Sequence, residues 1–194
     1  MRIFLKILIL ITIFQSFTKA DNISEFEIEG ISIGDSLLKK FSLNDIIDKI
    51  KNQKQHYNNN DFLLISFSIE SQKYDALRFH IKKNDKNYLA HHIGGYKFLD
   101  FNQCKNMKNK ISDDLSEIFG SSKRQDAKMK NHSYDKTGES KTISNYFNLK
   151  SGRIRIMCTD WSSTLTAEKN WQDNLQVNIY SKEFSNWLNN KAYK

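Results

Sequence analysis

The segment from Phe101 to Phe119 has the clearest periodicity in the chain. Its apolar side chains recur every three or four residues, which places them on one face of an amphipathic helix. Asp100 is suited to cap the start of such a helix, and Gly120 is suited to end it. We therefore predict a helix here whose first core-facing residue is Cys104. The apolar stripe comprises Cys104, Met107, Ile111, Leu115 and Ile118.

Two segments further along alternate apolar and polar positions in the manner of β-strands. They run from Thr142 to Leu149 and from Arg153 to Thr159, and residues 150–153 between them suit a hairpin with a two-residue turn. In the expected register Asn145 faces Cys158. This register directs Cys158 toward the apolar side of the hairpin.

Other segments predict two more helices and four more strands. Ser42 to Asp45 resembles a capping box with Asp in place of Glu, and Ser181 is suited to cap a final helix that carries Phe184 and Trp187 on one side. Alternating apolar residues predict three strands before residue 100 and one after residue 170. These strands cover Leu63–Ile69, Leu77–Ile81, Leu89–Ile93 and Leu175–Ile179.

The order of these elements indicates the fold class. Each half of the chain reads as a helix followed by three strands, and each strand has one apolar and one polar face, as an antiparallel sheet covered on one side requires. We predict an α+β fold with antiparallel sheet of about six strands, built as two helix-plus-three-strand halves, with helices packed on one face and a C-terminal helix. The charged segment Ser121–Lys141 is predicted to be a mobile loop.

Residues 1–20 have the pattern of a secretory signal peptide, with Arg2 and Lys6 before a short apolar run and Ala20 at the expected cleavage position. A membrane-spanning helix needs about 20 apolar residues, so we expect no transmembrane anchor after cleavage. We predict one α+β domain over residues 21–194, located in the periplasm. Its formal net charge is +5, from 27 basic and 22 acidic side chains, because the leader removes three of the basic residues.

The two cysteines are predicted to form a disulfide bond. Cys104 on the helix and Cys158 on the strand both face the layer between them, a geometry that a bridge requires. Export to an oxidising compartment makes pairing the default expectation. The alternative is two free buried cysteines, which behave as small hydrophobic side chains.

Residues 34–37 spell GDSL, the signature of a large family of serine esterases and lipases. In those enzymes an Asp-x-x-His block near the C-terminus supplies the base, and a serine without a base is a poor nucleophile at neutral pH. None of the five histidines here has an aspartate three residues before it. We therefore predict no catalytic residue and interpret the segment as a turn that starts a short helix. A hydrolase that uses Ser36 remains the alternative.

The histidines and the basic residues indicate no cofactor. His80 and His92 are predicted to lie diagonally on the polar face of a hairpin, about 7 to 8 Å apart, and two ligands are at most half of a zinc site. We expect His91 on the apolar face, and we predict no metal and no other cofactor. The basic residues between Lys123 and Lys141 alternate with acidic ones, so we expect no nucleic acid partner.

Two tryptophans flank one loop near the C-terminal strand. Asp160, Trp161 and Trp171 form a candidate binding surface if the two indole rings are partly exposed, because tryptophan is enriched at binding hot spots. If the rings pack with Trp187 on the closing helix, they belong to the core instead. We favour core packing and keep the binding surface as the alternative.

Four segments resemble an uncharacterised family of exported proteins from SAR11-type marine bacteria. The segments are IEGISIGDSLL from residue 28, CKNMKNKISDDLSEIFG from residue 104, NYFNLKSG from residue 145 and SKEFSNWLNNKAYK from residue 181. The resemblance covers nearly all of the mature chain, and it implies a Gram-negative host and a periplasmic location but no activity.

A second, local resemblance covers Ile28 to about Ile93. Its Gly-x-Ser turn, paired short helices and three-stranded meander are similar to the small outer-membrane assembly lipoproteins of the BamE and SmpA type. Those proteins carry a lipidated N-terminal cysteine. The residue directly after the predicted cleavage position is Asp21 and not a cysteine, so the resemblance does not imply a lipid anchor.

The export signal, the predicted disulfide and the lack of a complete catalytic set together predict a periplasmic protein without catalysis. We expect a binding or interaction module whose partner is an unknown envelope protein or a small ligand. The alternatives are the serine hydrolase and a purely structural envelope protein.

Overall fold

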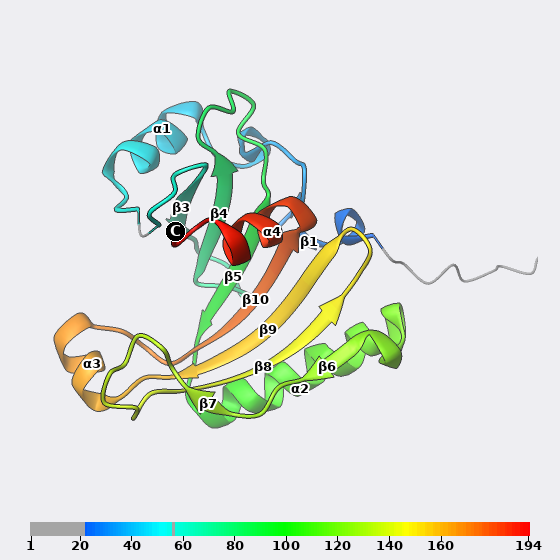
Figure 1. Cartoon of the computed structure of the whole chain (residues 1–194), viewed down its shortest axis with the longest axis vertical. Coiled ribbons are helices and arrows are strands. Elements are labelled where there is room, and N and C mark those ends of the chain that lie inside the picture. The colour runs from blue at the N-terminus through cyan, green and yellow to red at the C-terminus, as the bar shows by residue number, and fades with distance from the viewer. Residues whose placement is uncertain (1–21, 56) are drawn as a thin grey trace, which may run out of the picture.

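The structure is a computed structural model that describes residues 22–55 and 57–194, so the predicted signal peptide over 1–20 lies outside the described residues. Helices and short 3₁₀ turns alternate with strands along this part of the chain (Figure 1). The α-helices are α1 (Leu43–Asn52), α2 (Phe101–Phe119), α3 (Ser163–Lys169) and α4 (Lys182–Asn190). The 3₁₀ helices are η1 (Ile23–Glu25), η2 (Leu37–Lys39) and η3 (Ser121–Lys123). No helix of the described residues is long and apolar enough to cross a bilayer.

The strands form one large antiparallel sheet and one small ribbon, which confirms the α+β class. The ribbon pairs β1 (Glu27–Ile28) with β2 (Ile31–Ser32). The main sheet has eight strands in the order β3-β4-β5-β10-β9-β8-β6, with β7 also paired to β8. Its strands are β3 (Phe62–Ser68), β4 (Ala76–Lys82), β5 (His92–Phe98), β6 (Arg124–Asp126), β7 (Lys130–Asn131), β8 (Lys141–Asn148), β9 (Gly152–Asp160) and β10 (Asn174–Ser181).

The count of eight strands corrects the predicted six. The two additional strands, β6 and β7, lie in the segment Ser121–Lys141 that was predicted to be a mobile loop. Both are short edge strands that pair with β8, and most of their side chains are polar and exposed. Because neither face of such a strand is buried, the sequence has no apolar alternation that would reveal it.

The two predicted halves join through β5 and β10, at the centre of the sheet. Two consecutive glycines of β5 allow the close packing there. A Cβ atom on Gly94 would lie 2.7 Å from Oδ1 of Asn178, and one on Gly95 would lie 2.5 Å from the ring of Tyr74. Both distances are too short for real carbon contacts, so a larger residue would displace these neighbours.

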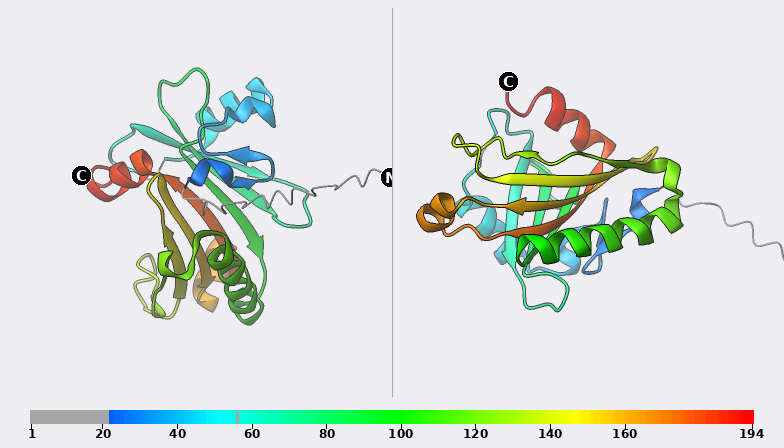
Figure 2. Two further views of the ribbon diagram at one scale, coloured as in Figure 1. Left: turned by 90° about the vertical axis from the view of Figure 1, so that its right-hand side faces the viewer. Right: turned by 90° about the horizontal axis from the view of Figure 1, so that it is seen from below.

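The two faces of the main sheet have different coverings. On the core face, apolar strand residues such as Phe79 and Ile156 pack with α1, α2 and the β1–β2 ribbon in one cluster. On the opposite face, called the open face below, α4 covers one end of the sheet, where Phe184 contacts Phe62 of β3, His80 of β4, His92 of β5 and Tyr180 of β10. Figure 2 shows α2 and α4 on opposite sides of the sheet. The expectation that helices pack on one face holds for α1 and α2 but not for α4.

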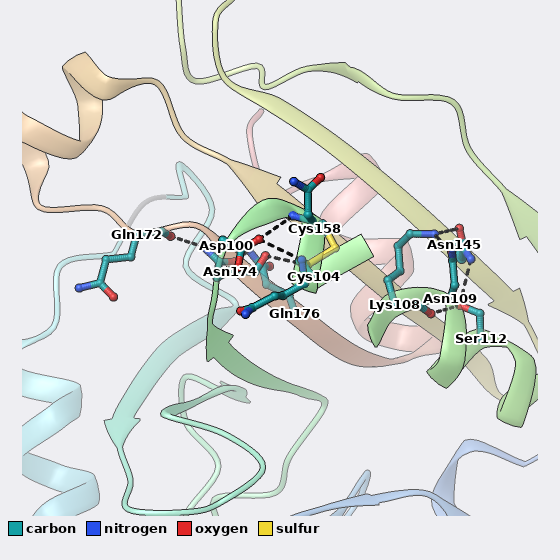
Figure 3. The surroundings of a disulfide bond; sticks show 12 residues. Asp100, Cys104, Lys108, Asn109, Ser112, Asn145, Cys158, Gln172, Asn174 and Gln176 are labelled. Carbon is teal, nitrogen blue, oxygen red and sulfur yellow. Dashed lines mark hydrogen bonds between the residues drawn. A yellow bond between two sulfur atoms is a disulfide. The ribbon is translucent and has the colours of Figure 1, made fainter. Parts of the chain in front are cut away.

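Helix α2 begins and ends at the predicted caps, but its buried face is rotated from the predicted one. Asp100 accepts hydrogen bonds from two backbone N–H groups, and Gly120 ends the helix with φ of 89°. Met107 is 42% exposed, whereas Lys108 is 3% exposed. The Lys108 ammonium donates to Oδ1 of Asn145 at 2.9 Å, and burial lowers the pKa of Lys108 (Figure 3).

The predicted disulfide bond is present. Cys104 of α2 and Cys158 of β9 are bonded, with their Cα atoms 5.8 Å apart (Figure 3). The predicted hairpin register was wrong by two residues, because Cys158 faces Ile143 and the turn residues are Lys150 and Ser151. A slip of two residues leaves each side chain on the same face of the sheet. The inward direction of Cys158 was therefore correct.

We expect the double variant Cys104→Ala/Cys158→Ala to lose stability. The bridge joins residues 54 positions apart, and restricting the unfolded chain in this way contributes about 4 kcal/mol to the free energy of unfolding. Urea denaturation followed by circular dichroism measures the loss. Reductant should destabilise the wild type and leave the double variant unchanged. An equal response of both proteins to reductant would contradict the assignment.

Candidate functional site

Four aromatic side chains gather beyond one end of the main sheet. The rings of Trp161 and Trp171 lie 4.5 Å apart between centroids, His132 lies 4.3 Å from Trp161, and Tyr134 lies 4.8 Å from Trp171. We call these four residues the aromatic cluster. Both tryptophans are half-buried, and Tyr134 is 55% exposed. The cluster therefore presents a contiguous aromatic surface to solvent.

The loops that carry the cluster are held by a local hydrogen-bond network. Asp135 accepts hydrogen bonds from the backbone N–H and the hydroxyl of both Thr137 and Ser140, and these bonds hold the pKa of Asp135 below its usual range. The hydroxyl of Ser140 in turn accepts a hydrogen bond from the backbone N–H of Ser162, the residue that caps α3. The loop bearing His132 and Tyr134 is thereby tied to the segment bearing Trp161.

A shallow cleft of about 440 Å³ adjoins the two tryptophans. Phe98, 45% exposed, contributes a further aromatic side chain. The charged residues of the lining are both acidic, Asp100 and Asp173. The full lining comprises Phe98, Leu99, Asp100, Trp161, Thr166, Trp171, Gln172 and Asp173. We call this site the aromatic cleft.

Each carboxylate of the cleft has a structural contact of its own. Asp100 accepts from the backbone of α2, and Oδ1 of Asp173 accepts from the backbone N–H of Trp161 at 2.8 Å. Asp160 does not line the cleft. Burial and the nearby charge of Asp173 raise the pKa of Asp160.

The structure places the predicted surface residues differently from the core packing that we favoured. Trp187 lies on α4, where its ring packs against Tyr57, Phe62 and Phe184. Trp161 and Trp171 contact each other instead and remain partly exposed. The preference for a shared tryptophan core is therefore wrong. Of the predicted surface residues, Trp161 and Trp171 line the cleft and Asp160 flanks it.

Sequence reasoning missed three aromatic members of this site, Phe98, His132 and Tyr134. His132 and Tyr134 lie in the segment that was predicted to be mobile, and no pattern linked them to the tryptophans. Phe98 carried a usable signal. It precedes Leu99 and the helix cap Asp100, so it had to lie where the first half of the sheet ends.

The GDSL residues form a turn at the start of η2. The Ser36 hydroxyl donates to the backbone carbonyl of Asn87 at 2.6 Å and accepts from the backbone N–H of Leu38 at 3.2 Å. Asp35 binds the ammonium of Lys39, which is the largest cause of its lowered pKa. No histidine of the described residues hydrogen-bonds the Ser36 hydroxyl. The contacts are those of a helix cap.

A buried histidine pair lies beneath α4. His80 and His92 face each other directly across β4 and β5, rather than diagonally, and their Nδ1 atoms are 2.9 Å apart. The chain of contacts continues from His80 to the Tyr57 hydroxyl at 3.0 Å and from His92 to Oδ1 of Asn178 at 3.1 Å. Burial lowers the pKa of both histidines, to about 4 for His92.

A larger cavity of about 860 Å³ lies between α4 and the β4–β5 turn. His91 lines it and contacts Phe62 and Glu183, so His91 lies on the α4 side and not on the predicted apolar face. The Glu183 carboxylate also pairs with Lys82 at 2.8 Å. Charges of both signs line this cavity, in contrast to the aromatic cleft. Among the described residues, no group of three His, Cys, Asp or Glu is placed to hold a metal ion.

No protein-family model matches the chain, and comparisons with curated proteins and with solved structures also find no match. The physical features of the sites therefore carry the functional argument.

We expect Ser36→Ala to act on stability and not on catalysis. Loss of the cap should lower the free energy of unfolding by about 1 kcal/mol, measured by urea denaturation against the control Ser133→Ala, whose serine is exposed. A fluorophosphonate probe should label neither the wild type nor the variant. Labelling of the wild type that is lost in Ser36→Ala would establish the hydrolase alternative.

We expect the histidine pair to make stability depend on pH. The unfolded chain takes up a proton on His92 near pH 6.5 and the folded chain near pH 4, so the unfolded state binds more protons between these values. Stability should therefore fall as the pH drops from about 6.5 to 4, by on the order of 3 kcal/mol from His92 alone. Urea denaturation at several pH values measures this slope.

The variant His92→Asn should flatten the pH dependence, whereas His132→Gln, at a half-buried position, should retain most of it. A wild-type stability that stays constant over this range would contradict the role of the buried pair.

Proposed function

We propose that this protein is an exported, non-catalytic binding protein of the cell envelope, and that the aromatic cleft takes a ligand with a positively charged amine or quaternary ammonium group. The single observation that carries this proposal is one cleft that combines partly exposed aromatic rings with two carboxylates and has no basic residue in its lining.

The aromatic part of the argument concerns solvent exposure. Large aromatic side chains gain free energy from burial, yet Trp161, Trp171 and Phe98 all leave part of their rings accessible at one place. Aromatic faces attract cations within about 6 Å of the ring centroid, and the attraction grows when the cation loses its water. Tryptophan is the strongest aromatic partner in such contacts.

The electrostatic part concerns the sign of the charge. The protein is basic, with a formal net charge of +8 for the full sequence, but the charged residues that line the cleft are Asp100 and Asp173. A local negative potential on a basic protein favours a cationic ligand over an anionic one. The cleft volume of about 440 Å³ falls within the range of small-molecule sites.

Export and periplasmic location are part of the same proposal. They are supported by the leader-like pattern of residues 1–20 and by the disulfide bond, which is typical of oxidising compartments. The resemblance to exported proteins of SAR11-type bacteria and to BamE and SmpA lipoproteins agrees with an envelope role. The hydrolase alternative has less support, since the Ser36 hydroxyl is engaged with backbone groups.

We expect the cleft to distinguish a cation from its neutral isostere. Choline should change the tryptophan fluorescence of the wild type, and 3,3-dimethyl-1-butanol, which has the same shape without the charge, should bind about tenfold more weakly. Titrations at constant ionic strength measure both dissociation constants. Equal affinities for the two compounds, or no binding of choline, would contradict the proposal.

Two variants locate the binding. Trp171→Ala should weaken choline binding about tenfold, because it removes one aromatic wall. Tyr193→Ala provides a matched control, since Tyr193 is 65% exposed near the C-terminus and does not line the cleft. An equal loss in both variants would show that the binding occurs elsewhere.

A further inference from the structure

The open face of the main sheet is positively charged and carries no carboxylate on its central strands. Along β4, β5, β10, β9 and β8, the side chains on this face are basic, aromatic, amide, hydroxyl or small, apart from the thioether of Met157. Three arginines, Arg78, Arg153 and Arg155, stand among them, and α4 covers only one end of the face. The charge of the open face is therefore not balanced from within the sheet.

The use of arginine on this face is selective. The chain has 25 lysines but only 5 arginines, one of which is in the predicted leader. The fourth arginine of the remainder, Arg124, forms ion pairs with Asp113 and Asp126. Arginine differs from lysine in its planar group, which stacks on aromatic rings and binds phosphate or carboxylate with two N–H groups at once. Its concentration on the open face indicates a role for that geometry.

Within the described part of the chain, the three arginines of the open face contact neutral groups. Arg78 lies 4.4 Å from the ring centroid of Tyr96 and donates to its hydroxyl. Arg155 donates to Ser144 and to the sulfur of Met157, and Arg153 donates to Asn148. No acidic side chain of the described residues lies within ion-pair distance of these three.

Two of these charges are concentrated around one ring. The guanidinium carbons of Arg153 and Arg155 lie 5.7 and 5.6 Å from the ring centroid of Tyr146. His132 lies near enough for the charge of Arg155 to lower the pKa of that histidine, although burial is the larger cause. Two like charges beside one ring repel each other. An anion that binds both would offset this repulsion.

An unsatisfied donor lies in the same region. Arg78, Gly94, Asn178 and Arg155 form one continuous row across β4, β5, β10 and β9. Asn178 is 2% exposed, and its Nδ2 atom has no hydrogen-bond partner among the residues that the structure describes. A buried amide donor without a partner costs about 1 to 3 kcal/mol. The row thus combines two arginines with a donor that lacks an acceptor.

We propose that the open face binds a soluble phosphate monoester, with its phosphoryl group held by Arg153 and Arg155. A phosphoryl dianion matches the two guanidinium charges and supplies three strong acceptor oxygens. Asn178 is paired with Arg155 in the row and is 2% exposed. An acceptor for its buried Nδ2 atom must therefore come from a small soluble molecule that displaces neighbouring side chains, and not from a flat bilayer surface. The site is separate from the aromatic cleft and does not depend on the cationic ligand.

Calorimetric titration of the mature protein with glycerol 3-phosphate tests the proposal. Glycerol is the neutral control, and a chloride salt keeps the ionic strength of all solutions equal. We expect binding of the phosphate ester and not of glycerol. Arg155→Gln and Arg153→Gln should each weaken binding at least about tenfold, because each removes a guanidinium that contacts the phosphoryl group. Arg155→Lys, which keeps the charge but not the planar group, should also bind more weakly.

Lys110→Gln is the matched control, since it removes the same charge from an exposed position on α2. Its affinity for glycerol 3-phosphate should equal that of the wild type. Circular dichroism and thermal unfolding establish that each variant is folded. Arg153→Gln and Arg155→Gln are separate tests, so the failure of one variant to fold leaves the other. Three results would overturn the proposal: no binding by the wild type, equal affinities of folded Arg155→Gln and Lys110→Gln, or binding only to phosphatidylglycerol vesicles.

Discussion

The disulfide bond between Cys104 and Cys158 links the helical layer of the protein to its sheet, and it does so beside the candidate site. Cys104 is four residues after Asp100, and Cys158 is three residues before Trp161. Asp100 and Trp161 both line the aromatic cleft. The covalent bond therefore restrains two walls of the cleft relative to each other, in addition to its effect on the unfolded chain. A ligand site with preorganised walls loses less entropy on binding.

The second constraint is that the two faces of the main sheet have different roles. Its core face packs against α1 and α2 through apolar side chains, and there even the buried Lys108 has amide partners, Asn109 and Asn145. Its open face is covered by α4 at one end only. Because alternate residues of a strand point to opposite sides, the same strands can stabilise the fold and present polar groups to a ligand.

The two candidate sites have opposite electrostatic character. The aromatic cleft has acidic groups beside exposed rings, whereas the open face has arginines stacked on tyrosines. In the cleft the aromatic faces are available to a ligand. On the open face the tyrosines already contact the arginines and hold them in place. One protein can thus carry separate sites for a cationic and an anionic ligand without competition between them.

The sequence by itself determined the helix caps at Asp100 and Ser181, the strands β3, β4, β8, β9 and β10, and the pairing of the two cysteines. These follow from local hydrogen bonding and from side-chain periodicity, which act over a few residues. The strand predicted over Leu89–Ile93 was misplaced, because β5 runs from His92 to Phe98. The register error of two residues in the β8–β9 hairpin did not affect the cysteine prediction, since such a slip preserves the face.

The tertiary structure alone decided the rest. It determined which side of α2 is buried, because Met107 and Lys108 lie on adjacent parts of the helix surface and only the fit against β9 and β10 distinguishes them. It paired β6 and β7 with β8 through backbone groups that every residue possesses. It also brought His132 and Trp161 together from distant segments. Contacts of this kind depend on how the layers pack, and no local pattern in the chain encodes them.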